Sequence, residues 1–152
     1  MKKTFTNGEI FTIANVLFGG RENEGFVKKG NLKITMSVRH ALKFNYIAIQ
    51  NANKVIEEMI NDIIKEIMDD FIEQNKATKN DDGCKVKDEY QNEFISIQQH
   101  KLNELSFQTV ELDLYTYSES DFEKYANLND GKLTNSELDV LELFVENSEE
   151  TE

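Results

Sequence analysis

Carboxylates at helical spacing are the side chains of this sequence whose types and positions come closest to a chemical site. Glu58, Asp62, Glu66, Asp69 and Glu73 recur every three or four residues, which places them on one face of a helix. Such a stripe could hold metal ions in a helical bundle, but di-iron bundles use Glu-x-x-His pairs and this chain contains none. We interpret the stripe as a solvated helix face and expect no metal, no catalytic group and no other cofactor.

A second interpretation gives part of this stripe a binding role. Carboxylates spaced along a rigid helix can imitate the phosphates of DNA, so Asp62, Glu66 and Asp69 are candidate partner-binding residues. Lys54 and Lys65 interrupt the negative charge of this face. A nucleic-acid mimic is therefore an alternative and not the leading hypothesis.

Basic side chains form one cluster, which starts in a glycine-containing loop and continues into the next predicted helix. Its members are Lys28, Lys29, Lys33, Arg39 and Lys43. The loop lacks the Gly-x-x-x-x-Gly-Lys-Ser/Thr order of a phosphate-binding loop and follows a predicted helix instead of a strand. With a single arginine and few lysines, the cluster fits an acidic protein partner better than nucleic acid. We predict that these five residues contact a partner protein.

A calcium-binding loop is suggested by residues 127–137 but fails at required positions. With Gly131 at loop position 6, the first and third ligand positions fall on Ala126 and Leu128, which supply no side-chain oxygen. A turn followed by a capping box over residues 134–137 explains the same pattern. We therefore interpret this stretch as a link between two helices.

Nucleophilic catalysis has no support in the sequence. Cys84 lies in a polar stretch, and neither His40 nor His100 can be placed near it. No Gly-x-Ser-x-Gly is present. We expect a protein that is not an enzyme, and only a catalytic site assembled by the fold would overturn this.

The net charge of −12 is divided unevenly along the chain. Residues 1–50 carry eight basic and three acidic side chains, whereas residues 104–152 carry two basic and fourteen acidic ones. Such polarity favours an oriented encounter with a charged partner, and the other interpretation is that a negative surface keeps the protein soluble. One cysteine gives no internal disulfide, and no run of 18 apolar residues is present. We therefore expect a cytoplasmic protein with no membrane partner.

The apolar periodicity predicts an α+β protein that is predominantly α-helical. A first helix starts at an Asn7 cap and stops at Gly19, before a polar loop. Residues 35–75 show the strongest helical pattern. A helix of that length either breaks near residues 51–53 or pairs with another helix in an antiparallel hairpin or a dimer seam.

The second half of the chain predicts a returning helix and a strand. Beyond a polar loop at residues 75–83, helical spacing resumes over residues 86–105 and indicates a helical hairpin with the long helix. Residues 110–117 alternate with the period of a half-buried strand, which would pair with residues 26–34, pair across a dimer or stay extended.

Two short helices, starting at Ser118 and Thr134, close the predicted fold. We expect one helical domain over residues 1–147 with one or two minor strands, and an acidic frayed tail over residues 148–152.

Two stretches resemble a group of small phage proteins of unknown function from low-GC Gram-positive hosts. One is residues 32–45 followed by the long acidic helix, and the other is residues 110–117 followed by residues 133–144. The resemblance is one of pattern and layout over most of the chain. It implies a phage or prophage accessory protein and supplies no functional residues.

Small acidic phage proteins often act by binding and blocking a host protein. The resemblance therefore leads us to expect a non-enzymatic interaction protein in the host cytoplasm that inhibits a host protein, for example one of a defence system. The alternatives are a phage structural or assembly protein and an acidic nucleic-acid mimic. Surplus apolar side chains on the long helix also predict a homodimer.

Overall fold

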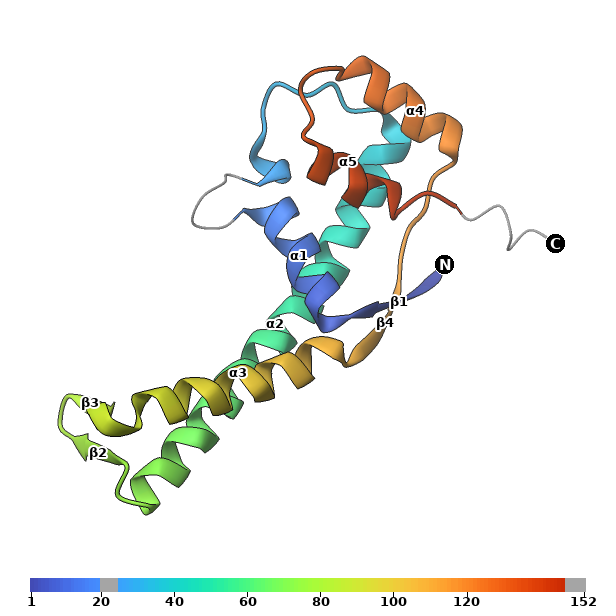
Figure 1. Ribbon diagram of the computed structural model, residues 1–152. Coiled ribbons are helices and arrows are strands. Elements are labelled where there is room, and N and C mark those ends of the chain that lie inside the picture. The colour runs from blue at the N-terminus through green and yellow to red at the C-terminus, as the bar shows by residue number, and fades with distance from the viewer. Residues whose placement is uncertain (20–24, 147–152) are drawn as a thin grey trace. The chain divides into compact units, whose positions relative to one another are not determined.

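Helices dominate the chain, and a few short strands accompany them (Figure 1). The computed structural model describes residues 1–19 and 25–146, and over them the expected α+β, predominantly helical class is confirmed. No helix in these ranges is long and apolar enough to cross a membrane. The predicted acidic tail lies outside the described residues.

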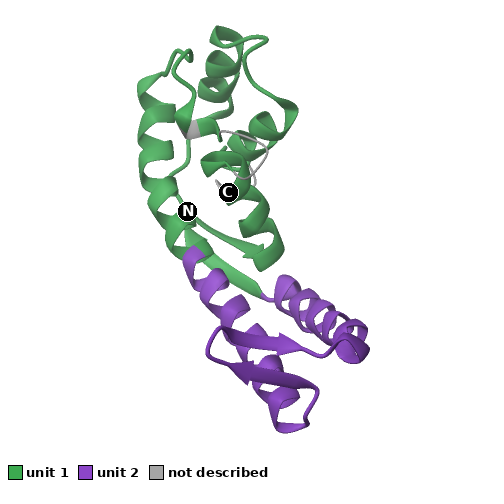
Figure 2. Cartoon of the chain, turned by 90° about the vertical axis from the view of Figure 1, so that its left-hand side faces the viewer, with its two compact units in different colours: residues 1–53, 109–152 green, residues 54–108 purple. Residues whose placement is uncertain are grey.

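Contacts within the chain divide it into two compact units, which Figure 2 distinguishes by colour. Unit 1 comprises residues 1–53 and 109–152, and unit 2 comprises residues 54–108. The single domain expected over residues 1–147 stays a prediction.

Unit 1 begins with a strand at residues where the sequence predicted neither a strand nor a helix. β1 (Lys2–Thr6) pairs antiparallel with β4 (Thr109–Asp113), in a register that sets Thr6 opposite Thr109 (Figure 1). Three arrangements were left open for the strand predicted at residues 110–117, and pairing with residues 26–34 was one of them; β4 pairs with β1 instead. Phe5 is the one buried side chain of β1 and also lies at helical spacing from the next apolar residues, so periodicity did not separate strand from helix.

The first helix, α1 (Asn7–Phe18), is capped by Thr6 and not by Asn7 as expected. The Thr6 hydroxyl accepts the backbone N–H of Glu9 at 3.1 Å, while Asn7 is already helical and buried. The helix ends at Gly19, whose φ of +87° is in the left-handed region. Its buried face consists of Ile10, Ile13, Ala14 and Leu17.

The long helix, α2 (Met36–Glu73), runs for 38 residues without the break considered near residues 51–53. Its part in unit 1 buries Val38, Ala41, Asn45 and Ile49. The Asn45 side chain makes two hydrogen bonds to the backbone of Tyr115. Its Nδ2 donates to the Tyr115 carbonyl at 2.8 Å, and its Oδ1 accepts the Tyr115 N–H at 2.7 Å. This pairing fastens α2 to the segment that follows β4.

Two short helices complete unit 1 as expected. α4 (Glu119–Leu128) starts at Ser118, whose hydroxyl accepts the N–H of Asp121 at 3.1 Å. α5 (Asn135–Glu142) starts with the predicted capping box of Thr134 and Glu137. Both N-caps are therefore confirmed.

Unit 2 contains the rest of α2 and the returning helix α3 (Gln91–Phe107), preceded by the short 3-10 helix η2 (Asp88–Tyr90). The polar loop predicted at residues 75–83 and the three residues that follow it form the antiparallel hairpin of β2 (Ala77–Asn80) and β3 (Gly83–Val86). Ala77 and Val86 are the only buried residues of these two strands. The hairpin therefore lacks the alternating apolar pattern by which a strand is recognised.

The predicted helical hairpin is confirmed by the core of unit 2. Ile67 and Phe71 of α2 are buried with Ala77 and Val86, and side chains of α3 pack against them. The rings of Phe71 and Phe94 meet edge to face with centroids 5.4 Å apart, an arrangement that aromatic pairs favour.

Candidate functional site

The predicted binding residues fall in different units. Asp62, Glu66 and Asp69 lie on α2 in unit 2, where all three are exposed. The five basic residues lie in unit 1, between the 3-10 helix η1 (Phe26–Lys28) and the first two turns of α2. The two sets are therefore separate candidate surfaces.

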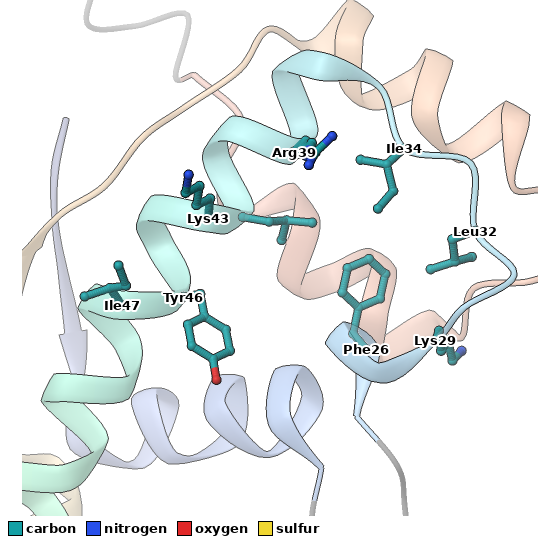
Figure 3. A pocket seen from close by; sticks show the side chains of 9 residues that line it. Phe26, Lys29, Leu32, Ile34, Arg39, Lys43, Tyr46 and Ile47 are labelled. Atoms are coloured by element: carbon teal, nitrogen blue, oxygen red, sulfur yellow. The ribbon is translucent and has the colours of Figure 1, made fainter.

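Three of the five basic residues line a pocket of about 490 Å³ in unit 1 (Figure 3). Lys28 and Lys33 do not line this pocket, although both are exposed in the same segment. We call it the basic pocket and define it by its lining residues: Phe26, Lys29, Leu32, Ile34, Arg39, Leu42, Lys43, Tyr46 and Ile47. The volume falls in the range of roughly 300–1,000 Å³ typical of binding sites.

One wall of the basic pocket is a single face of α2. Arg39, Leu42, Lys43, Tyr46 and Ile47 follow one another at steps of three, one, three and one residues, the spacing that gathers side chains on one side of a helix. The wall is fastened to α1 through Tyr46, whose ring meets that of Phe18 edge to face at 4.5 Å. Cations and apolar groups are therefore presented together by a rigid element.

The opposite wall comes from residues 26–34 and has no regular structure beyond η1. Figure 3 shows Leu32 and Ile34 pointing from this segment toward the side chains of α2. Gly25, with φ of +81°, allows the segment to start close to α1, because a Cβ there would lie 2.3 Å from the Phe18 carbonyl carbon. Phe26 follows directly and is 4% exposed, so it forms a fixed part of the pocket.

Contacts from the C-terminal part of unit 1 hold this second wall in place. Asn129, which is fully buried, accepts the N–H of Lys33 at 2.7 Å and donates to the Lys33 carbonyl at 2.8 Å and the Tyr125 carbonyl at 2.9 Å. The Lys132 ammonium donates to the carbonyl of Asn31 at 3.2 Å. Side chains from the C-terminal part of unit 1 therefore fix this irregular segment in place.

Lys29 makes the strongest of these attachments. Its ammonium group lies 2.5 Å from the carboxylate of Glu137 and also donates to the carbonyl of Lys132 at 3.2 Å. Burial raises the pKa of Glu137, but hydrogen bonds from Lys29 and the Thr134 backbone outweigh it, and the net pKa is lowered from the ordinary value. The charge of Lys29 is therefore compensated inside the protein.

Arg39 and Lys43 are the cations of the pocket that stay uncompensated. Both are exposed, and neither forms a salt bridge with any residue in the described part of the chain. They lie one helical turn apart on α2 and border apolar side chains. The arrangement can attract an anionic group and bury an apolar one beside it.

Two buried tyrosines near this region have raised pKa values. Tyr117 donates its hydroxyl to the carbonyl of Leu141, and burial, followed by the nearby Tyr125, raises its pKa far above the ordinary value. Burial and then the charge of Glu137 raise the pKa of Tyr125 to about 12. Both phenols therefore stay protonated at neutral pH.

A second hollow of unit 1, of about 400 Å³, brings together polar side chains that could suit catalysis. Its lining includes Ser37, His40, Asp121 and Glu146. Among the described residues, His40 has no hydrogen bond to Ser37 of the kind that a nucleophile–base pair uses. Among residues 1–19 and 25–146, no three metal-ligating side chains cluster.

The calcium-type stretch is occupied by contacts of its own. The side-chain oxygen of Asn129 accepts the N–H of Lys33. The Glu137 carboxylate accepts from the Lys29 ammonium and from the N–H of Thr134 at 2.9 Å. These groups serve as structural ties between the C-terminal helices and the second wall of the basic pocket.

The apolar half of the basic pocket was missed in the sequence. Phe26, Leu32, Ile34, Leu42 and Ile47 were assigned no site role. One signal could have revealed the region, because residues 25–56 contain six lysines and arginines and no acidic residue in a chain of net charge −12.

Comparison with known proteins found no match for this chain among protein-family models, characterised proteins or solved structures. The resemblance to small phage proteins therefore stays a prediction from sequence pattern.

Proposed function

We propose that this chain is a non-enzymatic, phage-type protein that binds one host protein through the basic pocket and blocks it. The proposal rests on one observation: two uncompensated cations, Arg39 and Lys43, border an open apolar pocket on a strongly acidic chain. A local positive patch of this kind orients an approaching acidic surface. Apolar groups beside the charges then supply affinity.

The pocket is also better built for binding than for catalysis. Among the residues that the structure describes, its walls carry no carboxylate, histidine or cysteine, and the third cation of these walls, Lys29, is held by Glu137. General acid–base and nucleophilic reactions need such groups within hydrogen-bond reach of a substrate. Blocking a partner requires only a stable complex.

The test compares charge reversals at and away from the pocket. The tagged chain is used to capture proteins from a low-GC Gram-positive lysate, alongside the variants R39E/K43E and K79E/K85E. The second variant makes the same change of net charge on the β2–β3 hairpin, where Lys79 and Lys85 are exposed. We expect one stoichiometric protein that is captured by the wild type and by K79E/K85E and is lost with R39E/K43E.

Two other results would contradict the proposal. A clean eluate from the hosts of such phages would argue for the structural or assembly alternative, which is checked by searching purified virions for the chain. Equal capture by all three proteins would mean that binding does not use the basic pocket.

A further inference from the structure

The cations of the basic pocket define the spacing of the groups that can bind them. Arg39 and Lys43 are four residues apart on α2, so their attachment points are separated by about 6 Å along the helix axis. Neither side chain forms a salt bridge with a described residue. A ligand with two anionic groups about one helical turn apart would therefore satisfy both.

The apolar surface at the pocket is larger than a small ligand needs. Ile34 and Ile47 on its rim are 55% and 54% exposed, and Met36 at the start of α2 is 69% exposed. The exposed apolar positions Met36 and Ile47 are eleven helical steps apart, or about 16 Å along the helix axis. This length matches about three turns of a second helix.

An extended strand is a poorer fit because the backbone of the second wall is already bonded. Asn129 takes both the N–H and the carbonyl of Lys33, and Lys132 takes the carbonyl of Asn31. A strand gains its affinity by adding to free backbone groups at an edge, whereas a helix binds a groove through side chains alone.

We propose that the basic pocket binds an amphipathic α-helix of the partner protein. Its apolar side chains at helical spacing enter between α2 and residues 26–34, and two carboxylates at positions i and i+4 face Arg39 and Lys43. This inference rests on the proposed function and specifies the segment by which the partner is recognised.

A second copy of this chain is the competing occupant. On α2 within unit 2, Glu58 and Asp62 are exposed and four residues apart, and Val55 and Met59 between and beside them are 48% and 39% exposed. This segment has the same chemistry as the proposed ligand. The experiment must therefore include the mass of the chain in solution.

The probe is a fluorescent, designed 18-residue helical peptide with leucines along one face and two glutamates at i and i+4. Its binding to the full chain is followed by anisotropy, beside a peptide with both glutamates changed to glutamine. Two exposed ion pairs of about 0.2–1 kcal/mol each predict that the glutamine peptide binds about 2- to 30-fold more weakly. A central proline in the peptide should abolish binding because it breaks the helix.

Variants of the chain locate the binding. With R39Q/K43Q the two peptides should bind equally weakly, whereas K79Q/K85Q should retain the preference for glutamate. I34S/I47S should weaken both peptides, and Ile95→Ser, at an exposed position of α3, should not. Salt raised from 0.1 to 1 M should reduce the preference, since it shortens the screening length from about 10 to 3 Å.

Three results would overturn the inference. Equal binding of the glutamate and glutamine peptides by the wild type would remove the charge argument, and unchanged binding by R39Q/K43Q would move the site elsewhere. A dimeric sedimentation mass that falls to the monomer with R39Q/K43Q would assign the pocket to a second copy.

The inference and the proposed function can fail separately. A host protein captured through the pocket but not displaced by the glutamate peptide would refute the helix and leave the function standing. A peptide that binds as described, with no host protein captured, would refute the function and leave the chemistry of the pocket standing.

Discussion

Replacing Asn129 by alanine should destabilise unit 1 more than any other single polar substitution near the pocket. The side chain is fully buried and makes three hydrogen bonds, two to Lys33 and one to Tyr125. A typical hydrogen bond contributes about 0.5–1.5 kcal/mol net, and a buried partner left unpaired adds a further cost. We expect a loss of about 2–4 kcal/mol in the free energy of unfolding.

Urea denaturation measures this loss, and tyrosine fluorescence assigns it to the correct unit. The chain has no tryptophan, and four of its five tyrosines lie in unit 1, the exception being Tyr90. With an m-value of about 2 kcal/mol/M, the midpoint should fall by about 1–2 M without a change in slope. Circular dichroism followed in parallel would show whether unit 2 unfolds in the same transition.

Asn127→Ala is the matched control, because Asn127 lies in the last turn of α4, two residues before the C-cap Asn129, and is exposed. It should change the midpoint by less than about 0.25 M, which corresponds to about 0.5 kcal/mol. If Asn129→Ala behaved like this control, the three hydrogen bonds would not hold the second wall, and the reasoning about a fixed pocket would fail.

Three further predictions concern ionisable and polar groups. The pKa of Glu137 is lowered in the folded chain. The ionised carboxylate therefore stabilises the fold above its ordinary pKa near 4.5, and this stabilisation is lost as pH falls through the folded pKa. Glu137→Gln should destabilise the chain at pH 7 and make the urea midpoint depend less on acid pH, whereas Glu142→Gln on the same helix should do neither. The Tyr125 hydroxyl has no hydrogen-bond partner in the described chain, so Tyr125→Phe should leave the stability unchanged or raise it. Tyr117→Phe removes the hydrogen bond to the Leu141 carbonyl and should lower the free energy of unfolding by about 1 kcal/mol. A melting temperature lowered more by Tyr125→Phe than by Tyr117→Phe would contradict this. D62N/E66Q/D69N should leave partner binding unchanged in a pull-down, and a lost partner would favour the nucleic-acid mimic.

Elements with a single, strong period could be predicted from the sequence. The long helix, its returning partner and the capping box at Thr134 each carry a pattern that only one structure explains. β1 and the β2–β3 hairpin could not be predicted, because each buries one or two side chains and their stability comes from pairing with a distant or mostly polar strand. Pairing of this kind leaves almost no local signal.

The basic pocket was half predicted for a similar reason. Charge is visible in a sequence, so Lys29, Arg39 and Lys43 could be selected. The wall formed by Leu32 and Ile34 is created by Asn129, about a hundred residues later in the chain. No local pattern states that a single asparagine will hold an irregular segment against a helix.

The pairing of β1 with β4 also has a consequence for synthesis on the ribosome. Thr6 pairs with Thr109, which is synthesised about 5–20 s after it at a rate of about 5–20 residues per second. Unit 2 is one continuous stretch, so it emerges complete and can fold while β1 still has an open edge. Such an edge is a template for aggregation, and lysines are a common protection. Lys2 and Lys3 at the start of β1 would protect the nascent chain from aggregation at this edge until β4 is synthesised and pairs with β1.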